Sequence, residues 1–307
     1  MALGGGVVTG TVIPMGSSTH RDEDVIGSAD LHTAFPRIFC VTDPAARVAA
    51  VIERRPRKWW RLSRWDLVSG ILDEGAWFRG TLYPQRCDLS PGGRWLSYFA
   101  FKHGSAWPAG ETYNAISRLP WLRALAAWEE IGTYSRGLHF VDDPGVWEVG
   151  DPIVGGVSVH EIVGGMRPTD SAQFATERRR GWRESVATLS RDPKDLWDEH
   201  RDVVMEKPSP GDDQVVLYVA GKFEAFRSSP QYWPPSPAPY SLNCRGARRA
   251  LPDMQWADWT GDGLLAVASQ TGDLQVRDGI GKRVIHEARL SNQEPEPKMA
   301  PAWAGEW

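Results

Sequence analysis

The sequence predicts an all-β protein. The chain has 307 residues, of which 31 are Gly, 23 are Pro and 16 are Trp, and 41% of the residues are hydrophobic. Gly and Pro are more frequent than in an average protein, and the apolar runs between them are short. Many short strands joined by tight turns explain this composition, whereas a helical bundle or a coiled coil does not.

The charge balance limits the classes of partner. The formal net charge is -4 at pH 7 and the isoelectric point is about 6.0. A protein that holds nucleic acid by bulk charge is expected to be basic. The sequence also has no run of eighteen apolar residues, the length that a membrane span requires. We therefore expect neither nucleic acid nor a membrane as partner.

Residues 1–37 are expected to form a flexible N-terminal segment. No Lys or Arg precedes Arg21, and glycines interrupt the apolar stretch, so the segment lacks the features of a secretory signal. Its apolar residues Val7, Val8, Val12 and Ile13 offer the alternative of a strand that closes onto the body of the protein.

The cysteines favour a reducing compartment. Cys40, Cys87 and Cys244 are odd in number and far apart, and no pair has the spacing of a zinc or redox motif. Three idle thiols are typical of a cytoplasmic protein, and this is the location that we predict.

Three segments contain alternating faces and turn signals in the order that strands require. Residues 58–70 alternate as a strand and end in Ser69-Gly70. Residues 86–101 predict a hairpin around Pro91-Gly92-Gly93, and residues 256–278 predict three strands joined by two Gly-containing turns. Shorter strand candidates are residues 47–53, 76–82, 138–141, 157–163 and 215–220.

Two further segments are less regular. Asp192-Pro193 predicts a short helix over 194–201, because Pro is favoured at the first helical position, and a strand over 203–207 is an equal alternative. A run of charged residues, 177–180, precedes this segment in the sequence. Residues 232–241 are too rich in Pro for a strand or helix and are expected to form a surface connection.

These segments resemble the blades of a β-propeller. "SPGGRWLSY" is similar to the turn between the first two strands of many WD40-like and TolB-like blades, and "RWDLVSG" is similar to the Trp-Asp end of a WD40 strand. "WADWTGDGLLAVASQTGDLQVRD" resembles the first three strands of one blade. The chain departs from the family pattern: Gly92 replaces the usual Asp, no Gly-His dipeptide occurs, and no fixed period of 40–45 residues recurs.

The resemblance implies an atypical β-propeller of about five blades. At about 50 residues a blade, the propeller is expected to span residues 38–290. The Pro-rich and polar residues 291–307 are expected to form a disordered C-terminal tail. The many tryptophans suit this fold, because large flat side chains fill the wedge between blades.

The propeller also implies a site. Residues 86–89 would be the innermost strand of one blade, and residues 112–121 would approach the same channel mouth from the next blade. We expect a small polar ligand to be held there by polar and aromatic side chains; the alternative is that Arg86 and Asp88 simply pair with each other. The candidate ligand-binding residues are Tyr83, Arg86, Asp88, Asn114, Ser117, Arg118 and Trp121.

Other groups of residues give weaker evidence of a functional site. The basic and aromatic residues 54–65 could hold phosphates, but in an acidic chain a solvated hairpin is the better interpretation. The seven histidines form no ligand pattern, so we expect no metal and no cofactor. No Gly-x-Ser-x-Gly or phosphate-binding loop occurs.

Two functions remain open at this stage. The first is a non-catalytic propeller that binds a protein partner or a small ligand at the mouth of its channel. The second is an enzyme, a hydrolase or small-molecule tailoring enzyme, with its active site in the central channel. Many carboxylates are available for a catalytic pair, but nothing in the sequence selects one.

Overall fold

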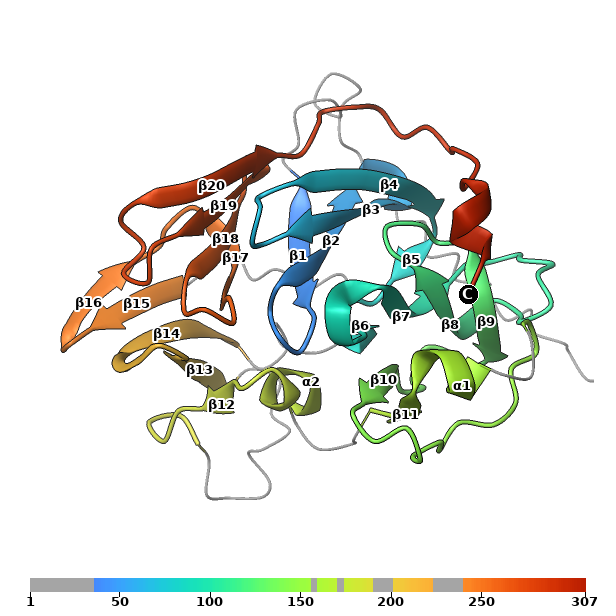
Figure 1. Ribbon diagram of the computed structural model, residues 1–307, viewed down its shortest axis with the longest axis horizontal. Coiled ribbons are helices and arrows are strands. Elements are labelled where there is room, and N and C mark those ends of the chain that lie inside the picture. The colour runs from blue at the N-terminus through green and yellow to red at the C-terminus, as the bar shows by residue number, and fades with distance from the viewer. Residues whose placement is uncertain (1–35, 156–158, 170–173, 190–200, 223–239) are drawn as a thin grey trace, which may run out of the picture. The chain divides into compact units, whose positions relative to one another are not determined.

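The computed structural model describes residues 36–155, 159–169, 174–189, 201–222 and 240–307 (Figure 1). These residues form five antiparallel sheets that follow one another along the chain. The predicted all-β class is confirmed, and the five consecutive sheets agree with a propeller of about five blades. Within each sheet most paired strands are neighbours in sequence, and many of them are joined by short turns.

The first two sheets contain the first nine strands. Sheet 1 has the order β1-β2-β3-β4, and in sheet 2 the order is β5-β7-β8-β9, with β6 paired to β7. Their bounds are β1 Arg37–Thr42, β2 Val48–Arg55, β3 Trp59–Asp66, β4 Leu72–Arg79, β5 Thr81–Leu82, β6 Asp88–Leu89, β7 Trp95–Phe101, β8 Thr112–Arg118 and β9 Ala124–Glu129.

The other three sheets follow in the same manner. Sheet 3 pairs β10 with β11, sheet 4 has the order β12-β13-β14-β15-β16, and sheet 5 has the order β17-β18-β19-β20. Their bounds are β10 Leu138–Val141, β11 Gly165–Pro168, β12 Arg183–Glu184, β13 Asp202–Ser209, β14 Asp212–Lys222, β15 Tyr240–Cys244, β16 Ala247–Ala250, β17 Met254–Trp259, β18 Leu265–Ser269, β19 Asp273–Arg277 and β20 Val284–Arg289.

Contacts between strands of different sheets place the sheets side by side. Strand β1 packs against β17 and against β6, and β6 also packs against β10. Sheet 4 joins this arrangement through β13, whose Lys207 forms an ion pair with Asp258 of β17. Sheets that follow one another in sequence and meet through one strand each are the arrangement expected of propeller blades.

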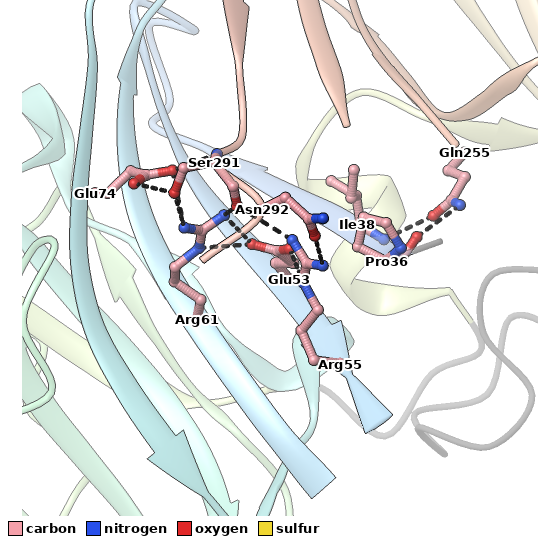
Figure 2. A network of polar contacts seen from close by, with 9 residues as sticks. All are labelled: Pro36, Ile38, Glu53, Arg55, Arg61, Glu74, Gln255, Ser291 and Asn292. Carbon is pink, nitrogen blue, oxygen red and sulfur yellow. Dashed lines mark hydrogen bonds and ion pairs between the residues drawn. The ribbon is translucent and has the colours of Figure 1, made fainter. Parts of the chain in front are cut away.

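Among the described residues, no strand is shared between the first and last sheets, because all four strands of sheet 5 come from residues 254–289. A side chain joins them instead (Figure 2). The amide of Gln255 accepts a hydrogen bond from the Ile38 backbone N–H at 2.7 Å and donates one to the Pro36 carbonyl at 2.8 Å. The Gln255 side chain thus bonds to the backbone on both sides of Arg37, at the start of β1.

The core fills the spaces between sheets. One cluster of buried side chains joins sheets 1, 2 and 5, a second joins sheets 4 and 5, and a third joins sheets 2 and 3. Trp65 and Trp259 are the largest fully buried side chains. Large rings between sheets agree with the role expected of Trp in this fold.

The predicted strands are mostly confirmed. The hairpin around Pro91-Gly92-Gly93 is β6 and β7, the three strands of 256–278 are β17, β18 and β19, and the alternative strand over 203–207 lies within β13. The candidate at 47–53 coincides with β2 apart from its first residue, the candidate at 138–141 is β10, and the candidate at 215–220 lies within β14. The single strand expected over 76–82 is wrong, because residues 76–79 end β4 in sheet 1 and Thr81–Leu82 form β5 in sheet 2. The connection expected over 232–241 is wrong for its last two residues, which begin β15. Residues 1–35, residues 232–239 and the helix expected over 194–201, apart from its last residue, lie outside the described residues.

The strand expected over 157–163 is wrong. Its described part is the helix α1 Val159–Val163. Val159 and Val163 are buried while His160, Glu161 and Ile162 are exposed, so the apolar residues recur after four positions rather than two. That spacing places both valines on one side of a helix.

The C-terminal residues also differ from expectation. Instead of a disordered tail, residues 291–307 are held at both ends. Ser291 donates its N–H to Glu74 and accepts hydrogen bonds from Arg61 (Figure 2), and a short 3-10 helix, Ala302–Gly305, buries Ala304 completely. Pro-rich composition excludes regular structure, but it does not prevent side chains from holding an extended segment in place.

Candidate functional site

The residues predicted to bind a ligand do not converge. Residues 112–118 form β8, which belongs to the same sheet as β6 and not to the next one. Ser97 of β7 pairs with Asp88 on one side and with Ile116 on the other, so β7 separates the two groups of candidate residues. The prediction that residues 112–121 approach from the next blade is therefore wrong. Residues 86–89 and 112–118 belong to one antiparallel meander, not to two sheets.

Three of the candidates hold a loop. The guanidinium of Arg86 donates to the Thr133 carbonyl at 2.6 Å and stacks on the rings of Tyr83 and Phe99, at 4.8 and 4.7 Å from their centroids. Asn114 donates to the Glu130 side chain at 2.5 Å and to the Arg136 carbonyl at 2.9 Å. These contacts fix residues 130–136, the loop after β9.

Three others lie elsewhere on sheet 2. Ser117 is completely buried, and Arg118 donates to the carbonyl of Trp303 at 2.9 Å while its guanidinium covers the Trp303 ring. The backbone N–H of Trp121 donates to the Arg118 carbonyl. Arg118 thus binds the C-terminal segment of its own chain.

One of the candidates, Asp88, lines a cavity. The cavity has a volume of about 370 Å³ and lies where the ends of β1, β6, β10 and β13 meet the helix α2 Ala175–Arg179. Ligand sites in proteins commonly have volumes of about 300 to 1,000 Å³. The lining residues are Thr42, Asp43, Pro44, Ala46, Asp88, Pro91, Phe140, Val141, Asp142, Arg179, Arg180 and Lys207.

The carboxylate of Asp88 joins two walls of this cavity. Its Oδ2 accepts a hydrogen bond from the Phe140 backbone N–H at 2.9 Å and forms an ion pair with Arg179 at 3.2 Å. Arg179 donates as well to the Phe140 carbonyl at 2.7 Å. Burial raises the pKa of Asp88, and the nearby guanidinium groups of Arg180 and Arg179 oppose that shift. Asp88 pairs with Arg179, not with Arg86.

Other charges in the cavity are only partly satisfied. The Arg180 guanidinium donates to the Cys87 carbonyl at 2.9 Å, but its buried Nε has no hydrogen-bond partner. Asp43 accepts hydrogen bonds from the backbone N–H groups of Arg47 and Val48 through Oδ1, while its buried Oδ2 has none. Lys207 is neutralised by Asp258 at 2.5 Å.

Sequence reasoning missed most of this cavity. Its charged residues Asp43, Arg179, Arg180 and Lys207 come from four separate places in the chain. One signal was visible: the run of charge at 177–180 supplies two of the arginines. A charge run is usually a solvated surface, so its position beside the inner strands could not be read from the sequence alone.

In the described part of the chain, no three His, Cys, Asp or Glu side chains lie close enough together to hold a metal ion. None of the helices described there has the length and apolar content needed to cross a bilayer.

Comparison with known proteins does not identify a family. No protein-family model matches the chain, and no curated protein matches it. Three solved structures show weak similarity. Sqt1 of Saccharomyces cerevisiae has a TM-score of 0.25 at 10% identity, with 84% of this chain and 76% of Sqt1 covered.

The other two are from fission yeast. The WD40 domain of SCAP has a TM-score of 0.24 at 11% identity, with 83% of this chain and 45% of that chain covered. A structure of the SREBP–SCAP binding domains has a TM-score of 0.23 at 11% identity, with 93% and 69% covered. The propeller-like fold is evident from the strand order and from the contacts between strands of different sheets.

Proposed function

We propose that this protein is a non-catalytic propeller that binds a small polar ligand in the cavity between its inner strands. The observation that carries the proposal is the lining of that cavity. Charged side chains from β6, β13, α2 and the residues that directly follow β1, β10 and α2 line it, and some of their polar atoms have no hydrogen-bond partner among the described residues. Buried polar groups are normally hydrogen-bonded, so such atoms mark a place where a ligand can bind.

The position of the cavity supports the same function. Its walls come from the ends of strands in four sheets, so the side chains that line it are held by a rigid framework. A framework of this kind keeps binding groups in place before the ligand arrives, which lowers the entropy cost of binding.

The enzyme alternative gains no support from the cavity. A glycoside hydrolase would need two carboxyl groups set across one substrate bond. Asp88 is instead engaged by Arg179 and by the Phe140 backbone, and among the described lining residues no carboxylate pair is distinguished as catalytic.

A thermal-shift screen of small polar molecules tests the proposed function. A ligand that binds the native state raises the unfolding midpoint. We expect hits with the wild type and with Arg178→Gln, because Arg178 is exposed and does not line the cavity. The same hits should be lost with Arg180→Gln. Hits that survive in Arg180→Gln, or a screen without hits, would contradict the proposal.

A protein partner is the second candidate, and a different surface favours it. The loop of residues 130–136 presents Ile131 and Tyr134, whose exposed fractions are 98% and 94%. Arg86 and Asn114 fix this loop by donating hydrogen bonds to its backbone carbonyl groups. Exposed aromatic side chains on a fixed loop are typical of interface residues.

Capture from an extract of the source cells, with quantitative mass spectrometry, tests this candidate. A partner should be enriched by the wild type and by Val186→Ser, which removes an apolar side chain that is exposed elsewhere. It should be lost with the double variant Ile131→Ser, Tyr134→Ser. Equal capture by the wild type and both variants would exclude the loop as the interface.

A further inference from the structure

The cavity contains two charged groups of opposite sign that do not neutralise each other. Asp43 comes from the end of β1, and Arg180 directly follows α2. No ion pair joins them, and neither forms one with another described residue. Asp43 is buried, and an unpaired charge that is removed from water is unfavourable. Arg180 is partly exposed and lies near the Asp88 carboxylate, but its Nε is buried and has no hydrogen-bond acceptor among the described residues.

Asp43 has the stricter requirement. The residue is only 2% exposed. Its Oδ1 is used by two backbone N–H groups, at 2.7 and 2.8 Å, which fix the orientation of the carboxylate. The second oxygen, Oδ2, is buried with no hydrogen-bond partner. A carboxylate oxygen accepts only, so its partner must be a donor, and a cationic donor matches its charge.

Arg180 has the complementary requirement. One of its terminal nitrogens donates to the Cys87 carbonyl, and its guanidinium lies 6.0 Å from the centroid of the Phe39 ring. The buried Nε has no partner. A guanidinium donates only, and it binds carboxylate or phosphate groups in a planar, paired geometry.

We propose that the ligand of this cavity is a small zwitterion that carries an ammonium group for Asp43 and a carboxylate group for Arg180. This inference rests on the proposed binding function. An anion alone would leave the buried Asp43 Oδ2 without a donor, and a cation alone would leave the buried Arg180 Nε without an acceptor. A metal ion is not favoured, because the described residues hold no cluster of three metal-ligating side chains.

The remaining lining residues fit such a ligand. Lys207 is already paired with Asp258, and Asp88 is paired with Arg179, so neither competes strongly for the ligand. Asp142 lies at the exposed rim and offers a second carboxylate near the ammonium group. A volume of about 370 Å³ holds a molecule of amino-acid size with room for bound water.

Isothermal titration calorimetry with matched probes tests the inference. The zwitterions are glycine, β-alanine and γ-aminobutyrate, which differ only in the spacing of their charges. The controls are acetate and methylammonium, each with one charge, and glycine betaine, whose cation donates no hydrogen bond. We expect at least one of the three zwitterions to bind roughly 10- to 100-fold more tightly than every control probe, which is the range for hydrogen bonds to charged groups.

Variants then locate the binding. Asp43→Asn keeps the oxygen that accepts the two backbone N–H groups but removes the charge, and Arg180→Gln removes the other charge. Each should weaken the best zwitterion by a similar 10- to 100-fold. The exposed neighbours supply matched controls, Asp143→Asn and Arg178→Gln, which should leave its affinity unchanged.

Three outcomes would overturn the inference. The first is that acetate binds as tightly as the best zwitterion, and the second is that methylammonium does so. The third is that Asp43→Asn binds the best zwitterion with the affinity of the wild type. If Asp43→Asn does not fold, the inference is decided by the affinities of the zwitterions and of the control probes for the wild type. Absence of all probe binding, together with hits from the polar screen that depend on Arg180, would reject the zwitterion while keeping the binding function. Absence of both would reject the two together.

Discussion

Glu53 and Arg61 face each other across β2 and β3 as a buried ion pair. The distance from Oε2 of Glu53 to the guanidinium is 2.7 Å, and both side chains are 1% exposed. Arg61 also pairs with Glu74 of β4 at 2.9 Å and donates to the side chain and the carbonyl of Ser291 at 2.6 and 2.8 Å (Figure 2). One side chain therefore joins three strands of sheet 1 to the segment that follows β20.

Removal of the Arg61 side chain is expected to destabilise the protein strongly. In Arg61→Ala, the buried Glu53 loses one of its two ion-pair partners and keeps Arg55. The free energy of unfolding should therefore fall by about 3 to 5 kcal/mol. Chemical denaturation monitored by Trp fluorescence measures this. Arg64→Ala is the control, because Arg64 is partly exposed and should cost less than about 1 kcal/mol. Equal losses would show that the buried network contributes little.

The two glycines of the Pro91 turn should differ in their tolerance of a side chain. Both have positive φ, +74° at Gly92 and +68° at Gly93, so alanine at either position costs about 1 to 2 kcal/mol of backbone strain. A Cβ at Gly92 meets nothing within 4 Å, whereas at Gly93 it would lie 2.5 Å from the Cβ of Val48. Gly93→Ala should therefore cost about 1 to 3 kcal/mol more than Gly92→Ala. Thermal unfolding of the two variants compares them, and equal midpoints would contradict the close approach to β2.

Two buried tryptophans should respond differently to the same substitution. The indole N–H of Trp259 donates to the Lys207 carbonyl at 3.0 Å, whereas the indole N–H of Trp65 is buried without a partner. Replacement by Phe removes similar volume from each site, but only Trp259→Phe also removes a hydrogen bond. We expect Trp259→Phe to be less stable than Trp65→Phe by about 1 kcal/mol in urea unfolding. The reverse order would show that packing, not the hydrogen bond, decides the difference.

Stability should fall in alkali. Burial raises the pKa of the Cys87 thiol to about 12 and that of Tyr113 to about 12, from ordinary values of 9.0 and 10.0. The unfolded chain loses these protons first, so between about pH 9 and 12 it binds fewer protons than the folded chain, and stability declines as pH rises. Melting midpoints from pH 8 to 11 measure the slope.

A matched pair of cysteine variants assigns the alkaline slope. Cys87→Ala should flatten part of the decline, because it removes one of the groups whose pKa is raised by burial. Cys244→Ala should leave the slope as in the wild type, because Cys244 is only partly buried. A decline that is unchanged in Cys87→Ala would show that other groups cause it.

The C-terminal segment should be released by a single charge at its buried point. Ala304 is completely buried, while Ala302 in the same turn is exposed. Ala304→Asp places a carboxylate in that buried position, so residues 301–307 should leave the surface of sheet 2. Hydrogen exchange of the Ala304 and Glu306 amides, which are bonded to Pro301 and Trp303, should then become at least tenfold faster. Ala302→Asp is the control, and the same exchange in both variants would contradict the docking.

Much of the fold follows from local pattern. The period of two in residues 95–101 and the turn chemistry of Pro91-Gly92-Gly93 are sufficient for the hairpin of β6 and β7. Five residues at 159–163 show the limit of this approach. A β-branched stretch this short fits a strand or a turn of helix, and burial at Val159 and Val163 decided for the helix.

The candidate site was less predictable from the sequence than the strands. Asp88 lies in β6 and lines the cavity, whereas Asn114 and Ser117 lie in β8 of the same sheet, because β6, β7 and β8 continue one meander. The partners of Asp88, namely Arg179 and the backbone of Phe140, come from 91 and 52 residues along the chain. Pairings over such separations leave no periodic signal in either segment.

By itself the sequence determined that this protein is built from short strands and tight turns, since alternation of side chains and the conformations of Gly and Pro act over a few residues. Only the tertiary structure decided that Asp43 and Arg180 line one cavity, that Arg61 is buried among carboxylates and that the C-terminal residues lie on sheet 2. These relationships depend on which sheets pack against each other. Packing is a property of whole surfaces, so no single stretch of the chain contains it.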